Sequence, residues 1–416
     1  MRLHVHFAME DHGLDTKLLA SFLKKSYHDA KPAEIVSADV KLAVPKGDNY
    51  GSTVFRVTFL ISTASGKKKK HSIIIKTIAG WTEVFSGVAR NVSPVFRSEI
   101  TVYNTIFPLM EALMEEFGDR RTKLWSEMIG YSPYNMIAFE DLNEDLHFGL
   151  KRKNCVNLKE SLLLLRSLGR FHAMSKVLIA RGYITEKDKG QIMLSLDTEF
   201  IEKLWEAYFT VLSNAMEDWG QEWKDISKKL SQLRKGVNKR WAEIGETYDK
   251  RFEVFNHGDL WTCNLLFKNM EFEEIPISVK FVDFQCCHIN SFIWDVDYFL
   301  YSSTIASVRR ANMELLHSAY QESLEKNLKF FNYDGYIPTL EDVKAESKRI
   351  EFVGMCTTFF QPIMVSEKQL DLAKVMTHSP EHVIDKSVYT DGKAKEILGE
   401  DLKKFYENGV MSANLC

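Results

Sequence analysis

Short runs in which apolar and polar residues alternate occupy much of the first third of the chain. Alternation with a period of two, in segments rich in β-branched and aromatic residues, is typical of strands with one buried face. Residues 64–66 form a turn signal between the second and third runs, and Gly130 and Pro133 form another between the last two. The pattern predicts strands at residues 35–42, 55–61, 72–78, 124–129 and 135–139.

Elsewhere the apolar residues recur every three or four positions, which is the period of a helix with one buried face. This spacing predicts helices at 12–30 and 96–114, with a kink or break at Pro108 because proline lacks the backbone N–H. Further helices are predicted at 158–180, 199–217, 221–249, 305–329, 340–364 and 394–407. The change from mixed strands to helices near residue 143 predicts an α+β protein with an N-terminal lobe (1–139), a hinge (140–144) and a helical C-terminal lobe (145–416).

The composition is that of a soluble globular protein. The 416 residues are enough for two domains, and their formal net charge of −3 favours neither nucleic acid nor an anionic membrane as a partner. The six cysteines include no C-x-x-C pair and no zinc-type spacing. Residues 1–15 lack the apolar core of a signal peptide, and no run approaches the roughly 20 apolar residues of a membrane span. We therefore expect a cytoplasmic protein, and the sequence implies no protein partner.

The clearest chemical pattern lies at residues 257–267, which read H-G-D-L-W-T-C-N-L-L-F, followed by an apolar run that ends in Asp283. Phosphoryl transfer needs a carboxylate that orients the attacking hydroxyl, and it needs oxygen ligands for the Mg²⁺ that neutralises the nucleotide phosphates. The spacing from Asp259 to Asn264 matches the D-x-x-x-x-N of kinase catalytic loops. We predict that Asp259 is the catalytic residue and that Asn264 and Asp283 bind Mg²⁺.

Other polar residues around this pattern are expected to have supporting roles. A free aspartate has a pKa of about 3.9, so Asp259 is expected to act by positioning and by late proton acceptance. His257 is expected to brace the loop by hydrogen bonds rather than to shuttle a proton. His172 is expected to be a packed helix residue, and Asp295 either caps a helix or bonds the catalytic loop.

A lysine and a glutamate of the N-terminal region form the expected nucleotide side. Lys76 follows the apolar run 73–75 and should lie near a strand end, where its ammonium group would reach the α- and β-phosphates of ATP. Such a lysine needs an acidic partner on the adjacent helix, and Glu99 is the candidate. The lysines at 67–70 lie at a hairpin and are expected to be solvated.

The phosphate loop is the loosest part of the pattern. Gly47 and Gly51 bracket a turn that is followed by Ser52, without a G-x-G-x-x-G pattern or a Walker lysine. Backbone N–H groups of a tight turn can bind phosphate oxygens, so we predict ATP binding here, with a plain hairpin turn as the alternative. Strand-end backbone groups at residues 136–141 are predicted to hydrogen-bond adenine. Glu140 and Asp141 either contact the ribose or are exposed acids of the hinge.

Taken together, H-G-D-x-x-x-x-N and the later V-D-F resemble the aminoglycoside phosphotransferase and choline kinase superfamily. The fuller form, with V-D-F-Q at 282–285, more closely resembles the insect ecdysteroid kinase-like family, over roughly residues 35–330. The strand lysine and the helix F-x-x-E with Tyr103 four residues on are similar to that family as well. The resemblance implies a bilobal protein-kinase-like fold that binds ATP and Mg²⁺ between its lobes. It also implies transfer of the γ-phosphoryl group to a hydroxyl of a small molecule, such as an ecdysteroid.

No motif defines the acceptor site. Five aromatic residues of the C-terminal lobe either line an apolar cavity or pack in the core: Trp205, Trp219, Trp223, Phe359 and Phe360. A hydroxylated steroid is favoured by the resemblance, and a choline-like or amino-sugar acceptor stays open. A pseudokinase that binds hydrophobic ligands is a further alternative, which would require a damaged metal or phosphate site. A protein kinase is disfavoured because the arginine of H-R-D is absent, Gln285 replaces the glycine of D-F-G, and no A-P-E follows.

Overall fold

The structure, a computed structural model, describes residues 16–26, 34–44, 52–62, 66–77, 96–132, 136–143, 147–149, 155–270, 275–366, 368 and 370–412. The chain divides into two compact units. Unit 1 comprises Met1–Tyr103 and Trp125–Phe148, and unit 2 comprises Asn104–Leu124 and Gly149–Cys416. The segment 104–124 thus belongs to unit 2, whereas the sequence pattern predicted it to be part of the N-terminal lobe. The functional hinge at 140–144 stays a prediction.

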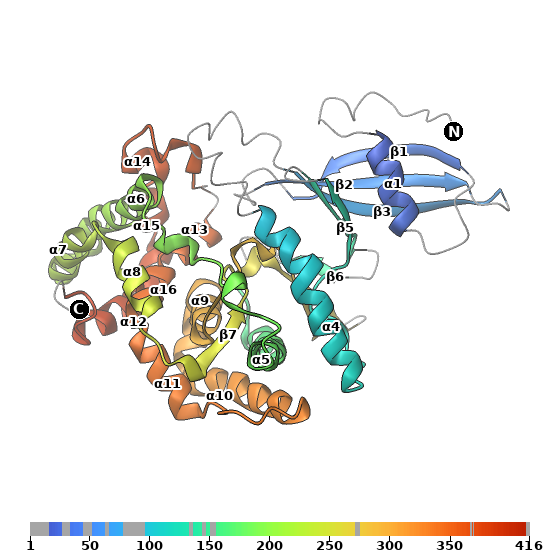
Figure 1. Cartoon of the computed structure of the whole chain (residues 1–416). Helices are drawn as coiled ribbons and strands as arrows, with labels where there is room; N and C mark the ends of the chain where they lie inside the picture. The colour runs from blue at the N-terminus through green and yellow to red at the C-terminus, as the bar shows by residue number, and fades with distance from the viewer. Residues whose placement is uncertain are drawn as a thin grey trace. The chain divides into compact units, whose positions relative to one another are not determined.

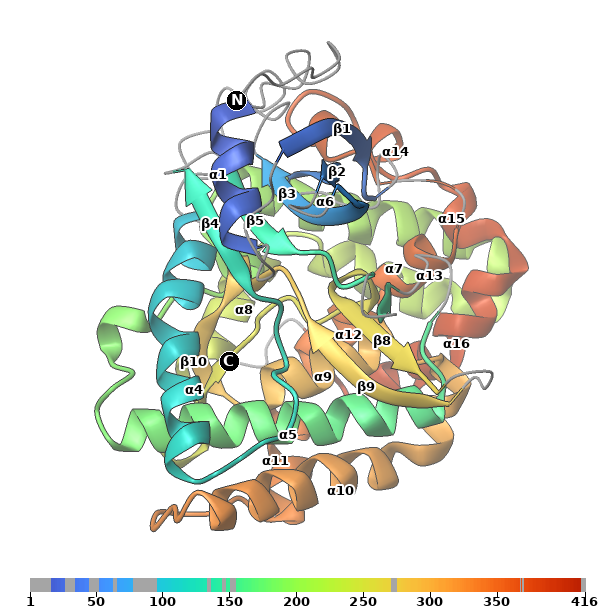
Figure 2. The ribbon, with the colours of Figure 1, turned by 90° about the vertical axis from the view of Figure 1, so that its right-hand side faces the viewer.

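Unit 1 is built on an antiparallel five-stranded sheet with the order β1-β2-β3-β5-β4 (Figure 1, and Figure 2 for β4). Alternate side chains of β2, including Val57, are buried together with Ile73 and Ile75 of β3 and with Phe22 of helix α1 (Thr16–Ser26). At Gly130 of β4 a Cβ atom would lie 2.8 Å from the Phe22 ring, so only glycine allows this close approach. The strands are β1 (Glu34–Leu42), β2 (Thr53–Ser62), β3 (Lys68–Thr77), β4 (Met128–Ser132) and β5 (Met136–Glu140).

A helix that contains a π-helical segment lies between β3 and β4 in the sequence. Residues 96–101 are α-helical, η2 (Val102–Ile106) is π-helical, and α4 (Phe107–Glu116) is α-helical again. Pro108 lies at the start of α4, directly after the π-helical segment. Proline has no N–H and its ring clashes with the carbonyl four residues before it, so a wider turn at this place removes the conflict. The predicted irregularity is present, but it precedes Pro108 and does not break the helix.

Unit 2 is mainly helical, and two of its long helices, α5 (Leu158–Ala180) and α10 (Ala306–Phe330), lie side by side (Figure 2). They approach closely at Gly169, where a Cβ atom would lie 2.8 Å from the backbone of α10. The bounds of α5 are those predicted from the sequence. The predicted helix at 221–249 is instead divided, because Gly236 adopts a φ of 74° and ends one segment before the next begins.

The remaining helices of unit 2 surround a few short strands. Strand β7 (Glu253–Asn256) pairs with β10 (His288–Ser291), and β8 (Leu265–Asn269) pairs with β9 (Pro276–Phe281), both antiparallel. Strand β4 begins four residues later than predicted because the carbonyl of Leu124 accepts the N–H of Phe281 (2.7 Å). The helices are α6 (Glu199–Ala215), α7 (Lys224–Leu233), α8 (Val237–Glu246), α9 (Ile293–Ser302), α11 (Leu340–Arg349), α12 (Glu351–Thr358), α13 (Phe360–Val365), α14 (Pro380–Val383), α15 (Ser387–Thr390) and α16 (Gly392–Glu407).

The predicted α+β architecture is therefore confirmed: a small unit with an antiparallel sheet and a larger, mainly helical unit, as in a bilobal kinase-like fold. Within the described parts of the chain, no helix is both long enough and apolar enough to cross a bilayer.

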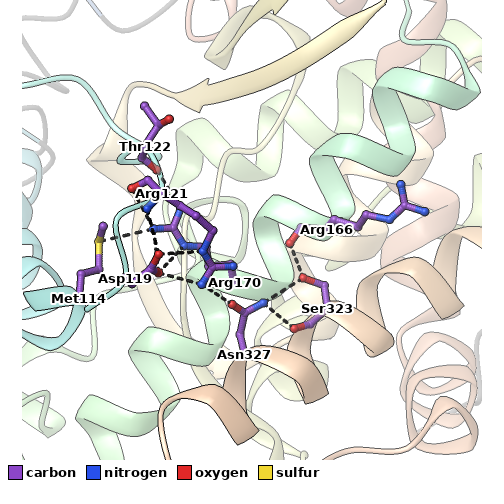
Figure 3. Close-up of polar contacts among 8 residues, drawn as sticks. All are labelled: Met114, Asp119, Arg121, Thr122, Arg166, Arg170, Ser323 and Asn327. Carbon is purple, nitrogen blue, oxygen red and sulfur yellow. Dashed lines mark hydrogen bonds and ion pairs between the residues drawn. The ribbon is translucent and has the colours of Figure 1, made fainter. Parts of the chain in front are cut away.

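A network of charged residues ties the segment after α4 to α5 and α10 (Figure 3). Asp119 accepts hydrogen bonds from Arg121 (2.8 Å) and from Arg170 of α5 (3.1 Å). Arg170 also donates to the carbonyl of Thr122, and Arg121 donates to Asn327 of α10, both at 2.8 Å. Burial raises the pKa of the Asp119 carboxyl group, but the two guanidinium groups lower it more, so its pKa lies below the usual value.

Replacing Asp119 by alanine is expected to reduce the free energy of unfolding by about 3 kcal/mol or more, because the buried Arg170 loses its counter-charge. Arg121→Ala is the matched control, since that side chain is 47% exposed and its pairing is worth about 1 kcal/mol or less. Urea unfolding followed by circular dichroism measures both variants. Equal losses in the two variants would contradict the role given to Asp119.

Candidate active site

The loop after β7 and the segment after β9 meet at one end of the β8–β9 hairpin. Residues 257–264 connect β7 to β8, and Asp283 follows β9 by two residues. The antiparallel register sets the first residue of β8 opposite the last residue of β9, and Val282 N–H donates to the carbonyl of Asn264 (3.0 Å). Asn264 and Asp283 therefore lie at the same end of the hairpin, as two ligands of one ion must.

Asp259 is held by a hydrogen bond to each of its carboxylate oxygens. Tyr298 of α9 donates its hydroxyl to Oδ1 (3.0 Å), and Asn264 donates its amide Nδ2 to Oδ2 (3.0 Å). The same amide nitrogen also donates to the backbone carbonyl of Asp259 (2.8 Å). The amide oxygen of Asn264 is consequently directed away from Asp259, as a metal-binding oxygen would be.

The surroundings of Asp259 raise the pKa of its carboxyl group to about 7. Burial is the largest cause and the nearby Asp283 carboxylate is the second, while the hydrogen bonds from Tyr298, Asn264 and Trp261 oppose them. The value for a free aspartate, on which the sequence-based expectation relied, is therefore wrong for this site. A carboxylate with a pKa near 7 accepts a proton at neutral pH far more readily than a free one.

His257 uses both of its ring nitrogens to brace the loop. Nδ1 accepts the backbone N–H of Asp259 (3.2 Å), so Nε2 carries the proton and donates to the carbonyl of Val282 (3.0 Å). The ring is thereby fixed between the loop and the segment that carries Asp283. The expectation that His257 is a bracing residue is confirmed, since neither nitrogen is left for proton transfer.

Asp295 of α9 anchors the backbone of the same loop. Its Oδ2 accepts the N–H of His257 (2.6 Å) and its Oδ1 accepts the N–H of Gly258 (2.8 Å). His172 of α5 bonds Oδ2 through Nε2 (3.1 Å) and bonds Tyr320 of α10 through Nδ1 (2.8 Å). Burial alone would raise the pKa of Asp295, but these hydrogen bonds and the neighbouring histidines outweigh it and lower the pKa. Of the two roles considered for Asp295, bonding the catalytic loop is the one observed.

Tyr298 is the residue of this site that the sequence-based reasoning missed. It lies three positions after Asp295 on α9, so both side chains emerge on the same side of the helix. Asp295 contacts residues 257 and 258, and Tyr298 contacts residue 259. The signal that could have found it is this i, i+3 spacing of Asp295 and Tyr298 in the first helix after the V-D-F segment.

Asp283 adopts a left-handed backbone conformation, with φ 67° and ψ 62°. For a residue other than glycine this costs roughly 1–2 kcal/mol, and such strain gathers at functional sites. Its carboxylate and the amide oxygen of Asn264 are the hard oxygen ligands that Mg²⁺ prefers, so these residues fit the ion. Among the described residues, no three His, Cys, Asp or Glu side chains form a metal-binding group. A Mg²⁺ ion here would therefore need further ligands from phosphate and water.

The predicted ion pair of unit 1 is present. Lys76 Nζ of β3 lies 2.6 Å from Glu99 Oε2 in the helical segment 96–101, and both side chains are buried. Burial makes the pair depend on each partner, because a lone charge would be unfavourable there. The ammonium group of Lys76 is thus held in one place, while its contact with phosphate stays a prediction.

The other residues predicted to bind the nucleotide are partly described. Ser52 is buried just before β2, whereas Gly47 and Gly51 lie outside the described residues. Glu140 is half-buried, and its Oε1 accepts the backbone N–H of Glu127 (2.9 Å). Nucleotide binding by these residues stays a prediction.

The expectation that Asp141 is an exposed acid is wrong. The residue is 7% exposed and accepts two hydrogen bonds from the Arg56 guanidinium, at 2.6 and 3.3 Å. It also accepts the backbone N–H of Asn143 (3.1 Å). Asp141 therefore ties the chain after β5 to β2, which nothing in the local sequence indicates.

The aromatic residues considered for acceptor binding differ in their burial. Trp205, Trp219, Trp223 and Phe359 are buried core residues, whereas Phe360 is half-buried. The Phe360 ring lies 6.3 Å from the Tyr298 ring, edge to face, and is stacked on Trp205 at 6.0 Å. Phe360 alone among the five thus combines partial exposure with a contact to a residue that bonds Asp259.

Comparison with known proteins agrees with this geometry. The model of a family described as the ecdysteroid kinase-like family matches residues 46–333, which is more than half of the chain. The matched region contains Lys76, Glu99, Asp259, Asn264 and Asp283. The search of curated proteins gave no match.

Replacing Gly258 by alanine is expected to disrupt the loop, because φ is 81° and the new Cβ atom would lie 2.0 Å from the carbonyl oxygen of Cys286. Gly182→Ala is the matched control: φ is 73°, but the new Cβ atom would meet nothing within 4 Å. Alanine at either position carries the strain of a positive φ. The difference in stability between the two variants therefore measures the clash of the new Cβ atom at position 258.

We expect the melting temperature of Gly258→Ala to fall several degrees below that of Gly182→Ala, since about 1 kcal/mol corresponds to roughly 2 °C or less in a chain of this size. Thermal unfolding by scanning calorimetry makes the comparison. Equal melting temperatures would show that the loop does not pack as closely against residue 286 as described.

Proposed function

This chain belongs to the ecdysteroid kinase-like family, and from that membership we propose that it is a small-molecule kinase that uses ATP and Mg²⁺ and phosphorylates a hydroxyl group. The observation that carries the proposal is the geometry around Asp259. Its two oxygens are held by Tyr298 and Asn264, and Asp283 lies at the same end of the β8–β9 hairpin. This is the set of groups that phosphoryl transfer to an alcohol requires.

In the proposed reaction Asp259 receives the hydroxyl group of the acceptor. The acceptor oxygen forms a bond to the γ-phosphorus, the bond from that phosphorus to the β–γ bridging oxygen breaks, and the hydroxyl proton moves to the Asp259 carboxylate. Because the carboxylate is fixed from two sides, it orients the hydroxyl for in-line attack before the reaction begins. A pKa raised towards neutral makes the final proton acceptance favourable.

Asn264 and Asp283 would hold the metal through one amide oxygen and one carboxylate. When bound, Mg²⁺ neutralises the charge of the nucleotide phosphates and of the leaving group. Asn264 would bind the ion through its amide oxygen while its amide nitrogen keeps the hydrogen bond to Asp259 Oδ2.

On the nucleotide side, we assign Lys76 to the ATP phosphates, with Glu99 as the residue that keeps the ammonium group in place. Backbone N–H groups at Gly47, Gly51 and Ser52 would add phosphate contacts, and the chain near Glu140 would contact the adenosine. A non-catalytic pseudokinase would require damage to this set. The intact Lys76–Glu99 pair and the complete Asp259 loop favour catalysis.

We propose a hydroxylated steroid, such as an ecdysteroid, as the acceptor, and the cytoplasm as the location. Family membership and the half-buried Phe360 ring beside Tyr298 support an apolar acceptor. A choline-like acceptor is the specific alternative, because aromatic faces also bind quaternary ammonium groups. The two differ in the acceptor's charge, so a direct comparison of substrates separates them.

The test of the reaction is transfer of label from γ-labelled ATP with Mg²⁺ to a panel of ecdysteroids, other steroids, choline and amino sugars. We expect a labelled ecdysteroid, and we expect Asp259→Asn to lower turnover by about 100-fold or more while ATP binding changes little. Asp218→Asn is the matched control, since that carboxylate is exposed and pairs with Lys386. Full turnover in Asp259→Asn would overturn its catalytic role. ATP binding without transfer to any acceptor would favour the pseudokinase.

Replacing Phe360 by alanine is expected to raise KM for the acceptor about tenfold, with KM for ATP unchanged. Burying one large apolar side chain against a ligand is worth roughly 1.5–3 kcal/mol, and about 1.4 kcal/mol is a factor of ten. Phe330→Ala, an exposed position at the end of α10, is the control and should change neither constant. An unchanged acceptor KM in Phe360→Ala would exclude this residue from the acceptor site.

A further inference from the structure

We propose that Tyr298 is a positioning residue for phosphoryl transfer, because its hydroxyl fixes the Asp259 carboxylate in the orientation that receives the acceptor. The inference rests on the proposed function of Asp259. Tyr298 is neither a proposed metal ligand, nor a proposed ATP-binding residue, nor the catalytic carboxylate itself.

The position of Tyr298 is set by contacts that do not involve the substrate. The residue lies in the middle of α9, whose earlier residue Asp295 is hydrogen-bonded to the backbone of His257 and Gly258. Its ring packs edge to face against Phe360 of α13. Helix and ring together bring the hydroxyl to 3.0 Å from Asp259 Oδ1. The helix that anchors the loop backbone therefore also anchors the loop's reactive side chain.

Hydrogen-bond donors on both oxygens determine the rotation of the Asp259 carboxylate. Asn264 binds Oδ2 from within the loop, and Tyr298 binds Oδ1 from α9. The two carboxylate oxygens together offer about four lone-pair sites, so the donors Tyr298, Asn264 and Trp261 leave acceptor capacity for the substrate hydroxyl. With the Tyr298 hydroxyl removed, Oδ1 loses its donor from α9, and the carboxylate turns more freely about its Cβ–Cγ bond.

Tyr298 acts in this scheme as a hydrogen-bond donor throughout. Burial, followed by the charge of Asp259 and the hydrogen bond to it, raises the pKa of the tyrosine well above its usual value, so the phenol stays protonated. The acceptor's proton goes to Asp259, and the proton of Tyr298 stays on its own oxygen. Its contribution is geometric, and an error of about 1 Å in such a group costs roughly 100-fold in rate.

The first test compares Tyr298→Phe with the wild-type protein, using γ-labelled ATP, Mg²⁺ and the acceptor that the panel identifies. Phenylalanine keeps the ring against Phe360 and removes only the hydroxyl. We expect kcat to fall about 10-fold to 100-fold, with KM for ATP within twofold and the melting temperature nearly unchanged. Tyr301→Phe is the matched control on the same helix, because the Tyr301 ring lies against Arg309 rather than Asp259. It should keep wild-type kcat.

The second test is a double-mutant cycle with Asp259→Ala, which removes the oxygens that Tyr298 contacts. If Tyr298 acts through Asp259, then Tyr298→Phe changes the residual rate of Asp259→Ala by less than twofold. A further loss as large as the loss in the wild-type background would overturn the inference, because it would show an independent role.

The outcomes separate this inference from the proposed function. Wild-type transfer with an unchanged kcat in Tyr298→Phe would overturn the role of Tyr298 and leave the kinase assignment standing. A lower melting temperature in Tyr298→Phe with unchanged kcat would assign the hydroxyl to stability alone, and would also overturn it. Absence of transfer by the wild-type protein to every acceptor would overturn the proposed function, and this inference with it.

Discussion

The buried carboxylate of Asp295 is the constraint on which the rest of the site depends. A charge in the interior is tolerated only when donors surround it, and losing a donor leaves it uncompensated at a cost of several kcal/mol. Here two of the donors are backbone N–H groups of the loop, from His257 and Gly258, and the third is His172 on α5. The loop therefore cannot move away without leaving this charge unsatisfied. Its geometry is determined by the packing of α5, α9 and α10, which are far from it in sequence.

Part of this arrangement could be predicted from the sequence. These features are set either by the local residue pattern or by groups that phosphoryl transfer requires. The bounds of α5 follow from apolar spacing, with an Asn157 capping box at its start. The Lys76–Glu99 pair was predicted because a phosphate-binding lysine near a strand end requires an acidic partner on the adjacent helix, and the two side chains are 2.6 Å apart. The D-x-x-x-x-N spacing likewise assigned Asp259 and Asn264 to one loop, and the structure adds a contact that was not predicted, the hydrogen bond from Asn264 to Asp259 Oδ2 (3.0 Å).

The features that could not be predicted depend on contacts between distant segments. The pKa of Asp259 near 7 arises from burial and from Asp283, which lies 24 positions later in the sequence. An exposed acid of the hinge was one of the two alternatives for Asp141, yet the residue is buried and paired with Arg56 of β2. Most of the aromatic residues considered for the acceptor site are core residues such as Trp205. The high aromatic content of the chain thus serves core packing more than ligand binding. Only the fold separates the half-buried Phe360 from the four buried aromatic residues.

The left-handed conformation of Asp283 has a consequence for how this protein would respond to selection. Glycine is the residue that adopts such a φ without strain, so the backbone at 283 would be more stable with the side chain deleted. Substituting the carboxylate would also relieve its repulsion of Asp259. A library screened only for heat resistance would therefore enrich glycine at this position and remove the carboxylate that we propose as a metal ligand. Thermostability and the proposed metal binding would favour different residues at position 283, so an engineering campaign that needs the proposed activity has to keep Asp283 unchanged.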